Sequence, residues 1–237
     1  MNTRTFKEHR AMKTKIILIA MLAVCTAVAQ ATLVDSWNSG SLSISIPDGN
    51  VAGIAGGSAY PDLQHTVTGL SDGGISTVEV RLNISGGYNG DLFGYLTYSD
   101  GSGTATAVLL NRVGTAPFYS DGSGFSSITL SDAGASSIQT FNPGSGVSVP
   151  TATYSAYESL NSAFGGMSGN GTWTLFLADM SGDAVPNSST LVGWGLDINV
   201  VPEPTTWALI IFAALLAAAK LPGWLRRAYA GWVARKI

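Results

Sequence analysis

Apolar and polar side chains alternate along several stretches between residues 32 and 200. Residues 78–84 and 194–200 alternate strictly, and Leu42, Ile44 and Ile46 alternate with serines before a turn at Pro47-Asp48-Gly49. A period of two puts one face of a strand in a core and the other in water. The pattern therefore predicts strands here. Further strand candidates are residues 92–98, 106–110, 125–130 and 173–178.

Turn-forming residues separate these strands. Residues 32–200 hold 27 of the 29 glycines, and Gly, Ser, Asn and Asp cluster between the apolar stretches, as tight turns require. No long segment of this region has helical periodicity. Many short strands separated by turns indicate a β-sandwich or jelly roll. The 169 residues from 32 to 200 suffice for one all-β domain with its own core.

The N-terminus has the pattern of a secretory signal. Five basic residues precede the apolar run Ile16 to Ala23, and Ala29 and Ala31 are the small residues that a signal peptidase needs. We therefore expect residues 1–31 to be a signal peptide cut after Ala31. Translation could start at Met1 or at Met12. A retained signal anchor is the alternative, but the apolar run is short for a membrane span.

The C-terminus combines a proline motif with a second apolar segment. Val201-Pro202-Glu203-Pro204 resists helix and sheet, because proline cannot donate a backbone hydrogen bond, and stays extended. Residues 207–224 follow and would form a helix of roughly 27 Å, just long enough to cross a bilayer. Arg226 and Arg227 form a basic cluster behind it. We therefore expect residues 201–237 to act as a unit with one transmembrane helix.

Charge divides the chain into the same three parts. Residues 32–200 carry two basic and 13 acidic residues, which leaves a net charge of −11, while the other ten Lys and Arg lie at the two ends. Basic segments that flank apolar ones stay in the cytoplasm, so the acidic middle should be the exported part. Its charge argues against binding nucleic acid or an anionic membrane. The single cysteine, Cys25, lies in the predicted signal peptide, so the mature protein would contain no disulfide.

Residues that could carry catalysis are few. His65 is the only histidine after residue 31, and we expect it at a strand edge. A Ser-His-Asp site around it is formally possible, but no Gly-x-Ser-x-Gly motif supports a nucleophile. No His or Cys cluster suits zinc, and no phosphate-binding loop occurs. A glycosidase with paired carboxylates is a further alternative. We therefore expect a protein that is not an enzyme and requires no cofactor.

Loop acids are the candidate metal ligands. Asp91, Asp179 and Asp183 are expected to fix a strand end and to shape the loop before the last strand. The alternative is a calcium site, because hard oxygen ligands suit Ca²⁺. Trp173 and Trp194, at alternating strand positions, are expected in the core. The better candidates for exposed stacking on sugars are Tyr88, Tyr95, Tyr98, Tyr154 and Tyr157.

The order of parts at the C-terminus resembles the bacterial PEP-CTERM sorting signal. The resemblance covers residues 201 to about 227, with the Pro202-Glu203-Pro204 motif, one membrane helix and the Arg226-Arg227 pair. It implies a protein exported by a Gram-negative bacterium and held for a time in the inner membrane. Its tail would be cut by exosortase, a membrane-embedded cysteine protease, on the way to the cell surface or extracellular polysaccharide.

Residues from about 65 to 200 resemble the P-domain of proprotein convertases, a jelly-roll β-sandwich. The resemblance is carried by residues 88–92, by residues 171–175 with their Gly-x-Trp pattern, and by the ending at Trp194-Gly195-Leu196. It implies a P-domain-like module over residues 65–200, preceded by an N-terminal β extension over residues 32–64. In convertases this module stabilises a protease, and residues 32–64 are too few for a catalytic domain.

Together these features predict an exported, noncatalytic surface or matrix protein. Signal peptidase and exosortase would process it, a transient C-terminal helix would hold it in the inner membrane, and it would serve a structural or adhesive role in extracellular polysaccharide. The alternatives are a carbohydrate-binding module and an accessory domain that stabilises a separate secreted protease.

Overall fold

A computed structural model describes residues 32–70, 73–115, 118–182 and 188–202 of the 237 residues. Several predicted features lie outside these residues. They are the signal peptide with Ala29 and Ala31, Asp183, Glu203 and Pro204 of the proline motif, the helix over residues 207–224, and Arg226 and Arg227. Within the described ranges, no helix combines the length and the apolar character needed to cross a membrane.

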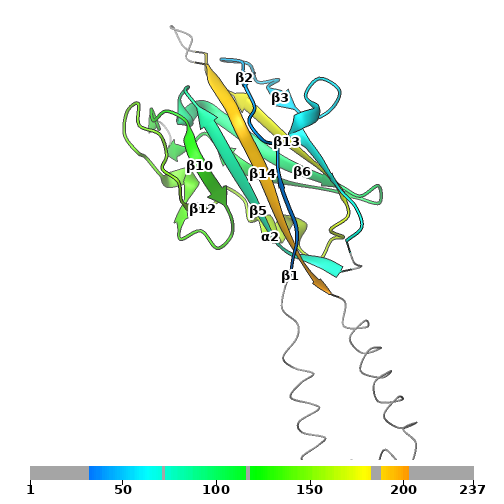
Figure 1. Ribbon diagram of the computed structural model, residues 1–237. Coiled ribbons are helices and arrows are strands. Elements are labelled where there is room, and N and C mark those ends of the chain that lie inside the picture. The colour runs from blue at the N-terminus through cyan, green and yellow to red at the C-terminus, as the bar shows by residue number, and fades with distance from the viewer. Residues whose placement is uncertain (1–31, 71–72, 116–117, 183–187, 203–237) are drawn as a thin grey trace, which may run out of the picture. The chain divides into compact units, whose positions relative to one another are not determined.

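The described strands form two packed sheets and one short ribbon (Figure 1). The larger sheet has the order β1 (Thr32–Asn38), β14 (Ser189–Pro202), β5 (Gly73–Ser85), β10 (Phe125–Leu130), β12 (Thr153–Ser155) and β11 (Ser136–Ser137), and β2 (Ile44–Ile46) also pairs with β14. The smaller sheet has the order β3 (Ile54–Ala55), β13 (Gly171–Asp179), β6 (Leu92–Ser99) and β7 (Thr104–Asn111), and β4 (Gln64–Val67) also pairs with β13. The ribbon pairs β8 (Gly114–Thr115) with β9 (Phe118–Tyr119).

Helical elements in the described residues are short. They are α2 (Leu160–Phe164) and the 3₁₀ turns η1 (Pro61–Leu63), η2 (Asn89–Asp91) and η3 (Ile138–Thr140). Ser159 caps α2 because its hydroxyl accepts a hydrogen bond from the Ser162 amide at 3.1 Å. The prediction of an all-β sandwich is therefore confirmed at the level of two packed sheets with few helices.

The core lies between the two sheets and follows the alternation of the sequence. On β5, Val78, Val80, Leu82 and Ile84 are buried while the residues between them are half-buried. Trp173 and Trp194 are also buried, and the Trp194 indole donates to the Asp62 carbonyl at 2.8 Å. The prediction that these two tryptophans belong to the core is confirmed.

Most of the predicted strands occur as expected, namely β5, β6, β7, β10, β13 and β14. The first strand, β1, was not predicted, because a register shift between Leu33 and Asp35 breaks the two-residue period that a regular strand would show. Residues 32–64, predicted as an extension, contribute β1 and β2 to the larger sheet and β3 to the smaller one.

Candidate functional site

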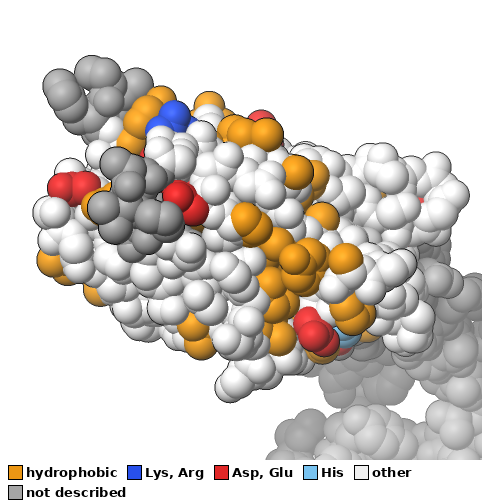
Figure 2. All heavy atoms as spheres, turned by 90° about the horizontal axis from the view of Figure 1, so that it is seen from above, with side chains coloured by type: hydrophobic (Ala, Val, Ile, Leu, Met, Phe, Trp, Pro, Cys, Tyr) orange, Lys and Arg blue, Asp and Glu red, His pale blue; other side chains and the backbone are white. Residues whose placement is uncertain are grey.

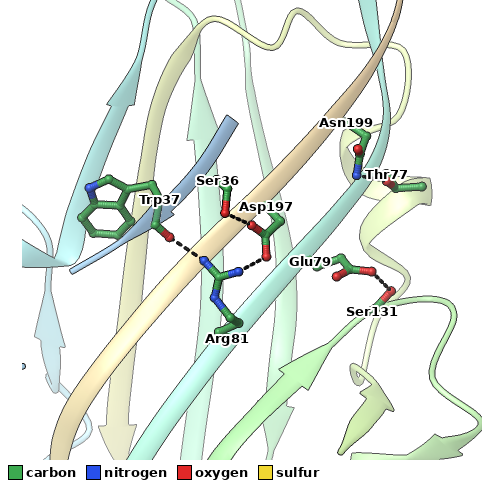
Figure 3. A network of polar contacts seen from close by, with 8 residues as sticks. All are labelled: Ser36, Trp37, Thr77, Glu79, Arg81, Ser131, Asp197 and Asn199. Carbon is green, nitrogen blue, oxygen red and sulfur yellow. Dashed lines mark hydrogen bonds and ion pairs between the residues drawn. The ribbon is translucent and has the colours of Figure 1, made fainter. Parts of the chain in front are cut away.

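A network of polar side chains lies on the outer surface of the larger sheet (Figure 3). Arg81 of β5 contacts the Asp197 carboxylate of β14 and donates to the Trp37 carbonyl of β1 at 2.8 Å. Ser36 donates to the other oxygen of Asp197. Arg81 thus connects three neighbouring strands, and its positive charge is compensated within the protein.

Two more contacts extend this network along the sheet. Asn199 of β14 donates its amide hydrogen to the Thr77 hydroxyl of β5 at 2.8 Å, and Ser131 donates to the Glu79 carboxylate at 3.0 Å (Figure 3). Charged side chains on this surface therefore hold neighbouring segments together. We assign them a role in stability.

A hollow of about 310 Å³ lies beside Arg81. Ser127, which lines it, has a positive φ of 50° at the register shift between β10 and β5. Such a backbone conformation is uncommon for residues other than glycine and is found at β-bulges and near functional sites. The other polar side chains that line the hollow belong to Asn38, Ser41 and Asn83.

His65 lies on β4 at the edge where the smaller sheet meets β1. Its Nε2 atom is 3.0 Å from the Asp35 carboxylate, and its ring stacks on Trp37 with centroids 4.5 Å apart. The expected position at a strand edge is confirmed, because β4 pairs on one side with β13. Among the described residues no serine, threonine or cysteine is hydrogen-bonded to His65.

The loop acids lie at the ends of strands. Asp91 precedes β6, and its carboxylate is 3.2 Å from the Arg112 guanidinium, which also stacks over the Tyr119 ring at 4.1 Å. Asp179 ends β13, and its carboxylate accepts a hydrogen bond from the Ser181 amide at 3.1 Å. These contacts agree with the expected roles in fixing a strand end and a loop.

The two acids are neighbours, since the Met180 amide donates to the Asp91 carbonyl at 2.8 Å. In the part of the chain that the structure describes, no group of three or more His, Cys, Asp or Glu residues could hold a metal ion. Asp183, the third candidate ligand, lies outside that part. The calcium site stays a prediction.

The five tyrosine candidates divide into exposed and buried residues. Tyr88 and Tyr157 are exposed at 37% and 47%, and Tyr95 is half-buried. For Tyr98 and Tyr154 the prediction of exposure is wrong, because both side chains lie in the core. Burial raises the pKa of both phenols, and the nearby Asp100 carboxylate adds to the rise in the pKa of Tyr98.

An aromatic group that the sequence interpretation missed lies on the smaller sheet. Tyr95 of β6 stacks on Phe176 of β13 with ring centroids 4.5 Å apart, and Phe93 meets both rings edge to face. All three side chains are half-buried. Alternation along residues 92–98 places Phe93 and Tyr95 on one face, but only strand pairing brings Phe176 beside them.

Acidic side chains dominate the charged surface, as the sequence predicts. Figure 2 shows hydrophobic side chains gathered in a band, with acidic groups at several places and basic groups in one small area. Only Arg81 and Arg112 are basic between residues 32 and 200. Both are engaged with aspartates, which leaves little to attract an anionic ligand.

The described residues thus define an all-β protein of two packed sheets. No protein-family model matches the chain, and no curated protein matches it. Among solved structures, it is similar to a chain in the crystal structure of the Aeromonas sobria serine protease (ASP) in complex with the chaperone ORF2, with a TM-score of 0.43 and 13% identity. The match covers 73% of this chain and 28% of that chain.

Proposed function

We propose that this protein is an exported, noncatalytic component of the cell surface or extracellular matrix, sorted by an exosortase. The observation that carries the proposal is the order of parts along the chain. A basic and apolar N-terminus precedes an acidic region without cysteine, and Pro202-Glu203-Pro204, an apolar segment and Arg226-Arg227 follow. This order resembles the PEP-CTERM arrangement, and the charge asymmetry favours export of the middle.

The position of the last strand supports the proposal. β14 runs from Ser189 to Pro202, so the sandwich ends at the first proline of the motif. The prediction that the motif resists sheet is wrong for Val201 and Pro202, because both belong to the end of this strand. Glu203 and Pro204 follow directly in the sequence. A processing enzyme would therefore find its motif immediately beside a folded domain. We propose that this domain is a P-domain-like jelly roll.

The arrangement around His65 supports a noncatalytic role. A serine nucleophile needs a base within hydrogen-bond reach, at about 2.6–3.2 Å. Here the Nε2 atom contacts Asp35, which leaves Nδ1 as the possible base; among the described residues no serine, threonine or cysteine is hydrogen-bonded to the ring, and Trp37 stacks on one of its faces. We propose that the mature domain acts by binding or by structure within the surface polysaccharide.

Mass spectrometry of the mature C-terminus tests the sorting proposal. In cells with an active exosortase we expect a chain that ends within or after the Pro202-Glu203-Pro204 region and has lost Ile237. Cells that lack the exosortase, and the variant Glu203→Ala in exosortase-active cells, should retain the full C-terminus. A wild-type chain that still ends at Ile237 in exosortase-active cells refutes the proposal.

A further inference from the structure

The outer face of the smaller sheet has a regular arrangement of side chains. Cross-strand pairs in the register of β3, β4, β13, β6 and β7 place twelve residues in three parallel rows of four. The rows are Ala55, Phe176, Tyr95, Val108; then Gln64, Thr174, Thr97, Thr106; then Thr66, Thr172, Ser99, Thr104. We call these twelve residues the threonine–aromatic face.

The side chains of this face point away from the core. All twelve are exposed or half-buried, whereas residues between them on the same strands, such as Leu96, Trp173 and Leu175, are buried. Neighbouring residues within a row lie on adjacent strands, about 4.8 Å apart, and successive rows are two residues along each strand, about 7 Å apart. The face is therefore a sheet surface with one aromatic row and two rows rich in hydroxyl groups.

None of the twelve residues is charged, although the region from residue 32 to 200 has two basic and 13 acidic residues. The larger sheet differs, because Glu79, Arg81 and Asp197 form contacts on its outer surface. The Glu158 carboxylate accepts a hydrogen bond from the Val108 amide at the edge of the face, and none of the twelve residues is a cation. The face therefore offers nothing to a phosphate, a nucleic acid or an anionic lipid. A neutral ligand with many hydroxyl groups is the chemical class that fits it.

The hydroxyl groups keep hydrogen-bonding capacity after they pair with one another. The Oγ1 atoms of Thr97 and Thr106 are 3.3 Å apart, and the Oγ1 atoms of Thr66 and Thr172 are 3.2 Å apart. Each hydroxyl has one donor and two acceptor positions, so a pair that shares one hydrogen bond keeps one hydrogen and three acceptor positions. Sugar hydroxyls likewise donate and accept. The Tyr95 and Phe176 rings stack on each other, so each covers one face of its neighbour, and their outward edges and remaining faces supply the apolar surface for the C–H groups of a sugar ring.

We propose that the threonine–aromatic face binds a neutral polysaccharide chain, with sugar rings on Tyr95 and Phe176 and sugar hydroxyls on the threonine rows. This inference rests on the proposed function, because it names the matrix component that the exported domain would contact. The hollow beside Arg81 fits a polysaccharide less well, since Trp194, the aromatic residue that lines it, is buried.

Co-sedimentation of the purified full-length chain in detergent micelles tests this inference. The neutral probes are cellulose, chitin and starch granules, and the anionic probe is alginate. We expect retention by at least one neutral glycan and none by alginate, with little change when the salt concentration rises, because no charge takes part. Retention by none of the neutral glycans overturns the proposal, and so does retention by alginate alone.

Variants assign the binding to the face. Tyr95→Ala should weaken retention about tenfold through the loss of ring stacking and buried area. The double variant Thr97→Val and Thr106→Val keeps branched strand residues but removes two hydroxyls, and should weaken it roughly two- to tenfold. The controls are Tyr157→Ala, an exposed tyrosine that is not one of the twelve residues, and Thr129→Val on β10 of the larger sheet. The threonine variants and wild type should have equal thermal midpoints. Equal retention by wild type and the double variant contradicts the inference.

A second copy of the chain could cover the same face. Sedimentation velocity distinguishes this case: a wild-type dimer that Tyr95→Ala converts to a monomer would identify a self-interface and overturn the glycan assignment. The glycan assay uses purified protein and does not depend on export or cleavage. Its failure is therefore distinguishable from failure of the sorting proposal, which the mass of the mature C-terminus reports.

Discussion

Gly195 has no side chain at the point where Arg81 crosses β14. A Cβ atom built on Gly195 would lie 2.8 Å from the Arg81 Nε atom, and also 2.8 Å from the Trp37 carbonyl oxygen. Contacts this short are not tolerated, so Gly195→Ala must displace the guanidinium, the backbone of β1 or both. Arg81 would then lose its hydrogen bond to Trp37 and part of its contact with Asp197.

Two free-energy costs set the size of the effect: overpacking around the new Cβ atom and the loss of the hydrogen bond from Arg81. Overpacking in a well-packed site costs about 1–3 kcal/mol, and losing a hydrogen bond from a charged donor costs about 1.5–3 kcal/mol. The two costs overlap, and Arg81 is partly exposed, which reduces the contribution of its ion pair. We expect Gly195→Ala to lower the free energy of unfolding by about 3 kcal/mol, and the thermal midpoint by roughly 6–12 °C for a domain of this size.

Urea unfolding and thermal melts of Gly195→Ala measure the effect. Gly103→Ala is the matched control, because a Cβ atom there would meet nothing within 4 Å. The double variant with Arg81→Ala identifies the route: if the cost passes through Arg81, the two substitutions are less than additive. A Gly195→Ala protein within about 0.5 kcal/mol of wild type, the range for neutral surface changes, would refute the reasoning, as would full additivity.

Three further predictions concern single groups. Burial raises the pKa of Tyr98, so the folded state holds that proton more tightly, and stability should fall as pH rises above the ordinary pKa of 10.0. Tyr98→Phe should flatten this alkaline decline in urea unfolding, and an unchanged slope would contradict the prediction. Hydrogen bonds from the Ser102 hydroxyl and from the Ser102 and Gly103 amides lower the pKa of Asp100. Ser102→Ala should raise the pKa of Asp100 in a carboxyl titration by NMR, and an unchanged titration midpoint would contradict the role of the Ser102 hydroxyl. A calcium site at Asp91, Asp179 and Asp183 predicts a higher thermal midpoint with calcium than with chelator, and equal midpoints would exclude it.

Alternation predicted the strands with a regular period but not their partners. Residues 78–84 and 194–200 have the expected pattern, and both occur in strands of the larger sheet. β1 escaped prediction because its register shift interrupts the period. Pairing between distant segments, such as Trp37 with Leu196, is set by how the sheets pack and leaves no local signal in the sequence.

The candidate site residues were likewise predicted only where the local sequence pattern was informative. Trp173 and Trp194 were assigned to the core from their positions in apolar runs, and both are buried. Tyr98 and Tyr154 were expected to be exposed, although Tyr98 shares its parity along β6 with Leu92 and Leu96, which pointed to the core. The threonine–aromatic face needed the register of five strands, because its rows join residues as far apart in the chain as Ala55 and Phe176.

The last strand has a mechanical consequence. β14 lies between β1 and β5 in the larger sheet. Thr32, the first residue of β1, is opposite Val200 near the end of β14, so the chain enters and leaves the sandwich on the same side (Figure 1). A pull on the chain beyond Pro202 would act along β14 and load the hydrogen bonds on both of its sides in shear, instead of opening them one at a time. A domain attached through this strand would resist drag from flowing liquid better than one attached through an edge strand.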